Sequence, residues 1–172
     1  MRGIQITFKG VPVLFHWSLL LCLPLFYAAT KSIIATCAGF ASFILLFVSH
    51  EAGHALMARR FRLRVYSVEI FLIHGRCKID RPRRLEDHVA IAWSGVLMQI
   101  VLLLVLMGLS IICRALNVRI PNALGAAFFV LGPINLGTAV INLIPRGQSD
   151  GVLAWKILPI AYSTAARKLR AR

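Results

Sequence analysis

Apolar residues form four long runs along this chain of 172 residues, and the polar residues lie between them. Each run reaches or approaches the roughly 20 residues that an α-helix needs to cross a bilayer. The pattern predicts about four transmembrane helices, at residues 13–29, 33–58, 89–113 and 123–144. A chain of this length fits one domain. The predicted fold class is therefore an all-α polytopic membrane protein, with the exception of one short segment.

That segment lies in the polar stretch at residues 59–87. Residues 65–73 are β-branched and aromatic, His74-Gly75-Arg76 has the composition of a turn, and Cys77-Lys78-Ile79 follows. This predicts a small membrane-associated β-hairpin between the second and third spans. A free edge of such a hairpin would suit an extended peptide, which adds to a sheet through backbone hydrogen bonds. A plain connecting hairpin explains the pattern equally well.

The fourth apolar run carries polar residues on one face. Gly132-Pro133 is expected to bend or break its helix. Asn135, Thr138 and Asn142 follow at spacings of three and four, which places them on one stripe. Because lipid would reject this stripe, it is expected to face the protein interior. On the third span, Gln99 is expected to be a buried amide.

The end of the fourth run predicts a loop and then a tail. Pro145 ends the helix, and residues 146–151 have the composition of a loop. Asp150 is thereby expected near the cytoplasmic end of the span. Residues 152–172 are too interrupted for a span, and they are expected to form an interfacial helix.

Composition excludes an ordinary water-soluble globule, because 59% of the residues are hydrophobic and the mean hydropathy is +0.78. The formal charge of +14 raises the possibility of nucleic-acid binding. However, the successive polar segments hold two, one, nine, two and six Lys and Arg, so 17 of 20 lie on one side of a four-span protein. This distribution follows the positive-inside rule and predicts a multi-pass protein with both termini cytoplasmic.

The expected location is the cytoplasmic membrane of a bacterium, with anionic lipids as partners and no nucleic acid. The first run is expected to be a retained anchor rather than a cleaved signal peptide, because His16, Trp17 and Pro24 interrupt it. The four cysteines show no C-x-x-C spacing, so neither a disulfide framework nor a thiolate zinc site is predicted.

The second run ends in the pattern H-E-x-x-H. His50 and His54 are four residues apart, so on a helix both imidazoles leave the same face and can reach one metal ion. Glu51 lies one position further round, where it can take a proton from a water molecule on that metal. On a helix this pattern is typical of a zinc site with a glutamate general base. Without a purpose, these groups would cost several kcal/mol at membrane depth.

A catalytic zinc site takes three protein ligands and keeps a fourth position for water. Asp150 is favoured as the third ligand, because the fourth helix delivers it to the same membrane level. The charges of Zn²⁺, Glu51 and Asp150 also sum to zero, which a low-dielectric site tolerates better than a net charge. Two alternatives stay open. Asp150 could be the N-cap of a helix that begins at Gly151, and a distant acid, Glu86 or Glu69, could be the ligand.

Three amides are expected to support this centre, either by binding substrate or by steadying the ligands. Asn142 would hold the substrate backbone or the loop that carries Asp150. Asn135 and Gln99 are expected behind it on the buried faces of their spans.

Together these motifs resemble the site-2 protease family of intramembrane zinc metalloproteases. The family signatures are H-E-x-x-H on one span and N-x-x-P-x-x-x-x-D-G at the end of a later one. Residues 50–54 and residues 142–151 match both at every fixed position, and the resemblance covers about Ile33 to Leu153. It implies one zinc ion per chain, Asp150 as the third ligand, and cleavage of transmembrane or membrane-adjacent protein or peptide substrates. An inactive zinc-binding scaffold or regulator is the alternative.

The chain departs from the family at three places, none of which removes a ligand or the base. Where the family often has Gly-Pro in the third span, this chain has Gly95-Val96. A glycine pair of the family's hairpin appears here as His74-Gly75-Arg76, and Ser149 stands where a proline often precedes Asp-Gly. These departures bear on how a substrate is positioned. The residues outside the resemblance are too few for a regulatory domain, so a minimal core is expected.

Overall fold

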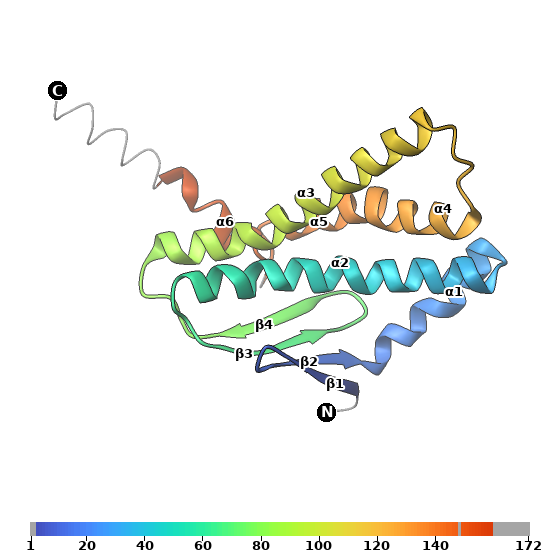
Figure 1. Cartoon of the computed structure of the whole chain (residues 1–172). Coiled ribbons are helices and arrows are strands. Elements are labelled where there is room, and N and C mark those ends of the chain that lie inside the picture. Colours follow the sequence, from blue (N-terminus) through green and yellow to red (C-terminus); the bar gives the residue numbers. More distant parts are fainter. Residues whose placement is uncertain (1–2, 148, 160–172) are drawn as a thin grey trace, which may run out of the picture.

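The computed structural model describes residues 3–147 and 149–159 (Figure 1). The chain begins with strands β1 (Gly3–Phe8) and β2 (Val11–His16), the 3-10 helix η1 (Trp17–Leu21), and helices α1 (Cys22–Thr30) and α2 (Ile33–Arg60). Strands β3 (Val65–Ile70) and β4 (Gly75–Ile79) precede the long helix α3 (Leu85–Ala115). The last elements are α4 (Asn122–Phe129), the π-helical turn η2 (Val130–Ile134), α5 (Asn135–Leu143) and α6 (Gly151–Ala154). Helix α2 lies in the middle, between the sheet and helices α3 to α5 (Figure 1).

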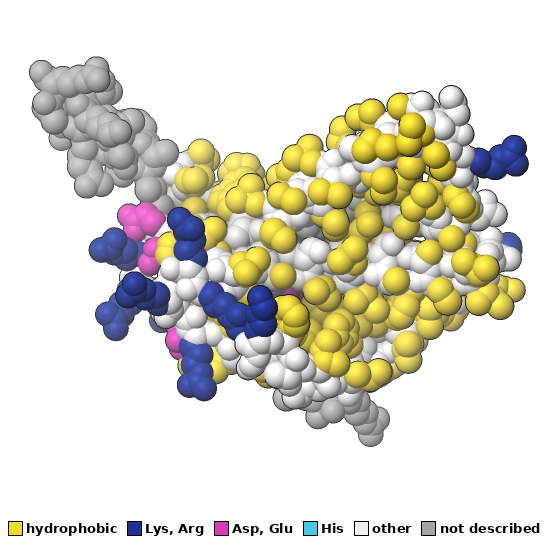
Figure 2. All heavy atoms as spheres, viewed as in Figure 1, with side chains coloured by type: hydrophobic (Ala, Val, Ile, Leu, Met, Phe, Trp, Pro, Cys, Tyr) yellow, Lys and Arg dark blue, Asp and Glu magenta, His cyan; other side chains and the backbone are white. Residues whose placement is uncertain are grey.

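Within residues 3–147 and 149–159, three helical segments are long and apolar enough to cross a membrane: Ile33–Arg60, Leu85–Ala115 and Asn122–Leu143. They correspond to the predicted second, third and fourth spans. Large apolar side chains cover their outer surfaces, as at Leu104 and Val105, which are 60% and 64% exposed. Figure 2 shows this apolar surface over the helices, with most Lys and Arg gathered at one end of the molecule. Such a surface suits lipid and not water, so the chain is a membrane protein.

The first predicted span is wrong in its N-terminal part. Residues 13–16 belong to β2, and the apolar helix covers Trp17–Thr30, which is shorter than the other three. A strand with apolar side chains on both faces forms a continuous apolar run, and periodicity alone does not distinguish it from a buried helix. The described chain is therefore mostly helical with a small sheet, and not all-α with one hairpin.

The sheet has four strands in the order β1-β2-β3-β4. The stretch at residues 65–79 does contain an antiparallel pair, β3 with β4, in which Ile70 lies opposite Gly75. Strand β2 runs parallel to β3, with Val13 opposite Val68, and β1 pairs antiparallel with β2. Val68 and Ile70 pack with Leu46 and Phe47 of α2 in the main buried cluster. This packing holds the sheet against α2.

The fourth apolar segment is interrupted where Gly132-Pro133 predicts a bend. Residues 130–134 form a single π-helical turn. Proline lacks the backbone N–H and its ring clashes with the carbonyl four residues earlier, so a wider turn accommodates it. After this turn α5 begins at Asn135, and the Asn135 side chain is buried against α3, as the polar stripe predicts. Of the predicted interfacial tail, α6 covers the first three residues, and residues 160–172 lie outside the described part.

Candidate metal centre

Helix α2 presents His50 and His54 on the face that packs against α3. Both imidazoles are buried, and their Nε2 atoms lie 3.1 Å apart. The close approach of α3 depends on Gly95, because a Cβ there would lie 2.6 Å from His54 Nε2 and 2.7 Å from His50 Cε1. Gly53 of α2 is needed for the same contact on the other helix, since a Cβ on it would overlap the Ser94 carbonyl oxygen. The smooth patch that the sequence predicts beside the histidines is thus a helix–helix contact.

The other ring nitrogen of each histidine is held by α3. His54 Nδ1 lies 2.7 Å from the carbonyl oxygen of Ile91, and His50 Nδ1 lies 3.0 Å from Gln99 Oε1. Both oxygens accept hydrogen bonds, so both Nδ1 atoms donate. In the neutral rings each Nε2 then carries a lone pair, which is the arrangement in which histidines bind metals.

The orientation of the Gln99 amide follows from a chain of hydrogen bonds. Thr138 Oγ1 donates to the Asn135 carbonyl oxygen at 2.9 Å, and it accepts from Gln99 Nε2, also at 2.9 Å. Gln99 Oε1 is therefore the atom that faces His50. The Asn135 side chain in turn donates from Nδ2 to the Gln99 backbone carbonyl. Gln99 and Asn135 thus lie behind the histidines, where the sequence expects them.

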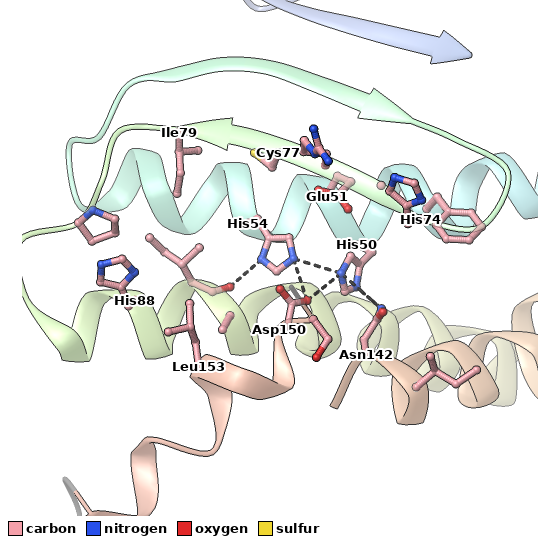
Figure 3. A pocket seen from close by; sticks show the side chains of 18 of the residues that line it. His50, Glu51, His54, His74, Cys77, Ile79, His88, Asn142, Asp150 and Leu153 are labelled. Atoms are coloured by element: carbon pink, nitrogen blue, oxygen red, sulfur yellow. Dashed lines mark hydrogen bonds and ion pairs between the residues drawn. The ribbon is translucent and has the colours of Figure 1, made fainter. Parts of the chain in front are cut away.

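Asp150 reaches both histidines from the loop after α5. Its Oδ2 lies 3.1 Å from His50 Nε2 and 3.2 Å from His54 Nε2 (Figure 3). Its side chain makes no capping hydrogen bond to α6, although Asp150 occupies the N-cap position. The geometry therefore favours the ligand role over the capping role for this carboxylate.

Glu69 and Glu86, the alternative ligands, and the nearby acid Asp80 are engaged or lie elsewhere. Glu69 is paired with Lys78, and Asp80 accepts hydrogen bonds from the Arg64 backbone N–H and the Tyr66 hydroxyl. Glu86 is exposed in the first turn of α3, where an acid is favourable at a helix N-terminus. The alternative ligands thus gain no support from their positions.

The three converging atoms fit a metal ion. A tetrahedral zinc site with bonds of ~2.0–2.1 Å places neighbouring donor atoms roughly 3.3 Å apart, and the three separations here are 3.1, 3.1 and 3.2 Å. Two imidazole lone pairs and a carboxylate repel one another unless a cation or protons lie between them. Glu51 lies beside this triangle, since ligand atoms of His50, Glu51 and His54 are all within 4.8 Å of one another.

The site opens into a cavity of about 670 Å³ between β4, α2, α3 and the Asp150 loop. Strand β4 crosses directly over Glu51, so that a Cβ on Gly75 would overlap the carboxylate (Figure 3). Asn142 lines the cavity from α5, with its Nδ2 3.5 Å from both ring nitrogens of His50. These equal, long distances describe contact with the ring face and leave the Asn142 amide available to another group.

Two features of the cavity were not predicted from the sequence. The Ile91 carbonyl holds His54, but every residue has a carbonyl, so no side-chain pattern marks it. Cys77 lines the cavity beside Glu51. Burial, reinforced by the Glu51 charge, raises the pKa of the Cys77 thiol to about 12, so it is not a thiolate ligand.

Comparison with known proteins gives matches in sequence and in fold. No family model matches the chain. The protein named "Putative zinc metalloprotease sll0528" from Synechocystis sp. is 33% identical over 117 residues, which are 66% of this chain and 30% of that relative. The structure of the site-2 protease from Methanocaldococcus jannaschii matches with a TM-score of 0.68 and 22% identity, over 91% of this chain and 71% of that one.

The fold and the site define a class: a helical membrane protein with a buried His-Glu-His cluster suited to a metal ion. Within that class, the chain resembles the site-2 protease family of intramembrane zinc metalloproteases, in its motifs and in its fold. The alignment spans less than a third of the length of the Synechocystis relative.

Proposed function

We propose that residues 1–172 form a single intramembrane zinc metalloprotease domain, which hydrolyses peptide bonds of transmembrane or membrane-adjacent substrates. The observation that carries the proposal is the convergence of His50 Nε2, His54 Nε2 and Asp150 Oδ2 within 3.2 Å of one another, with Glu51 at their side. His50, His54 and Asp150 would hold one zinc ion. Bound zinc would supply a Lewis acid that polarises a peptide carbonyl and activates water.

Glu51 is the proposed general base. Its carboxylate would accept the proton of the attacking water and then deliver it to the leaving amine. Strand β4 and the packed helices restrict water around this carboxylate, which is 3% exposed as a residue. Asn142 would donate its amide to the substrate backbone, because its side chain lies over the His50 ring and lines the same cavity.

The membrane placement supports the substrate class. The histidines lie near the Arg59-Arg60 end of α2, where most Lys and Arg gather (Figure 2). By the positive-inside rule this end would face the cytoplasm, with both termini on that side of a bacterial cytoplasmic membrane. A substrate would then be cut near the cytoplasmic end of a span. Anionic lipids, and no nucleic acid, are the proposed partners of the basic surface.

The decisive experiment compares the wild type, Glu51→Gln and Asp150→Ala in the same host membranes. Fragments of membrane proteins are measured by mass spectrometry, and zinc in the purified chain by elemental analysis. We expect Glu51→Gln to lose fragments while keeping zinc, and Asp150→Ala to lose both. The alternative, an inactive zinc-binding scaffold, has no observation of its own in favour. The scaffold alternative would be supported if membranes with the wild type and membranes with Glu51→Gln contained the same protein fragments.

A further inference from the structure

A second cavity lies on the opposite face of α2 from the histidines. It measures about 380 Å³ and is lined by α2 on one side and by strands β1, β2 and β3 on the other. Its α2 lining includes Val48, Ala52, Ala55 and Arg59, which share one helix face about half a turn away from His50. The small side chains of the two alanines leave space on the helix side of the cavity. On the opposite side, the buried strand residues Val11 and Val68 form apolar walls. We call this cavity the hairpin groove.

The hairpin groove has the length of one lipid leaflet. From Val48 to Arg59 is eleven residues, or about 16 Å of helix. The hydrocarbon core of a bilayer is about 30 Å thick, so one leaflet takes roughly half of that. Its rim is open and apolar, with Ile6, Phe8 and Leu56 51%, 65% and 59% exposed. An acyl chain lying along α2 would therefore match both the length and the chemistry of the groove.

Both polar residues that line the groove are cations at one end. Arg59 Nη2 donates to the Lys9 backbone carbonyl at 3.1 Å, which places the Arg59 guanidinium beside the Lys9 main chain, and both residues line the groove. Within the described part of the chain, no ion pair engages either one. Lys9 Nζ lies 5.7 Å from the centre of the Phe8 ring and is otherwise exposed. The basic end of the groove thus offers several N–H donors to an anion at the depth where headgroups lie.

We propose that the hairpin groove binds one anionic phospholipid, with its phosphate between Lys9 and Arg59 and an acyl chain along the Ala52–Ala55 face. A transmembrane helix is a poorer occupant. An apolar helix would leave the Lys9 and Arg59 cations at the end of the groove without an anionic partner. The proposal does not rest on peptidase activity, since the groove and the histidines lie on opposite faces of α2.

The test uses the full chain in phosphatidylcholine vesicles that contain a photoreactive probe. One probe is phosphatidylglycerol with a diazirine in its acyl chain, and the other is phosphatidylcholine with the same diazirine. After irradiation, labelled peptides are mapped by mass spectrometry. We expect phosphatidylglycerol to label the α2 and β2 walls of the groove at least several-fold more than phosphatidylcholine does. In Lys9→Gln/Arg59→Gln this preference should be lost, so that the two probes label the walls to about the same extent.

Matched variants distinguish this site from general attraction to the basic surface. Arg60→Gln/Arg83→Gln removes the same charge from exposed cations that do not line the groove, and it should keep the preference for phosphatidylglycerol.

A second pair of variants tests the apolar part of the groove. Ala55→Trp fills the groove and should reduce labelling by both probes. Ala52→Ile serves the same purpose if the tryptophan variant fails to fold. Equal labelling by the two probes would overturn the proposal, as would an equal loss in both charge variants. Labels confined to other surfaces, or exclusion of both probes by a co-purified protein segment, would also overturn it.

Discussion

At His50, the orientation of one ring is set by residues on two other helices. The Asn135 carbonyl can only accept, which makes Thr138 a donor to it and an acceptor from Gln99, and so turns the Gln99 oxygen toward His50 Nδ1. Hydrogen bonds to the far nitrogen of a metal-binding histidine fix its tautomer and raise its basicity. Helix α5 therefore acts on the candidate metal centre through this chain, as well as through Asn142.

The first prediction concerns this chain. Gln99→Leu removes the acceptor for His50 Nδ1, and we expect the affinity for zinc to fall about 10- to 100-fold. Thr138→Val removes only the partner of Gln99, so its loss should be smaller. Zinc affinity is measured by competition with a chromogenic chelator, and thermal unfolding of the zinc-free chain verifies that each variant folds. If Gln99→Leu binds zinc as tightly as the wild type, the buried amide does not orient His50.

At the scale of elements, the site depends on how closely α3 approaches α2. Gly95 and Gly108 lie on the same helix in different surroundings. A Cβ on Gly95 would overlap both imidazoles, whereas a Cβ on Gly108 would meet no atom within 4 Å. Comparing alanine substitutions at the two glycines therefore separates two effects: the cost of a side chain at the helix–helix contact, and the intrinsic preference of a helix for alanine over glycine.

The second prediction uses this pair. Gly95→Ala should move the imidazoles or separate the helices, and so reduce zinc binding at least tenfold, because donor atoms must stay close to ~2.0–2.1 Å from the ion. Gly108→Ala should leave zinc binding unchanged and stabilise the chain by up to about 1 kcal/mol, the helix propensity difference between the two residues. Zinc content and thermal unfolding are measured on both. Equal zinc binding in the two variants would show that the site does not need the close contact.

Helices and strands were predictable from the sequence where the pattern of apolar and polar residues fits only one kind of element. The second and third spans, at 33–58 and 89–113, lie within α2 and α3, because runs of more than twenty apolar residues suit little else. The polar stripe of α5 was predictable because a single helix face carried it. Strand β2 was not predictable, since the apolar run at residues 13–15 fits a helix and a strand equally well. The strand is fixed by its partner β3, which lies more than fifty residues away in the sequence. The position of Asp150 beside the histidines was expected because the fourth helix ends at their membrane level, and the paired motifs imply the same residue.

For the whole molecule, the sheet determines where the N-terminal segment must run. Lys9 lies at the Arg59 end of α2, because Arg59 binds its carbonyl. Lys31 lies at the other end, one residue before the N-cap Ser32. Helix α2 has 28 residues, or about 42 Å of length, so β2, η1 and α1 together carry the chain from one end of α2 to the other. The shorter first helix thus covers only the part of this path that β2 leaves, and the sheet lies toward the end with the basic residues.

The third prediction tests this arrangement in intact cells. Single cysteines replace Lys9, Lys31, Arg83 and Arg119, all exposed, in a chain whose own four cysteines are changed to serine or alanine. A membrane-impermeant maleimide should label Lys31→Cys and Arg119→Cys from outside, and Lys9→Cys and Arg83→Cys only after the membrane is opened. The chain without cysteine measures background labelling. If Lys9→Cys reacts from outside together with Lys31→Cys, the N-terminal strands do not share a side with β3, and the parallel pairing of β2 with β3 fails with them. If all four labels are reversed, the pairing stands and the positive-inside orientation is wrong, because the order of crossings is kept while the basic end faces outward.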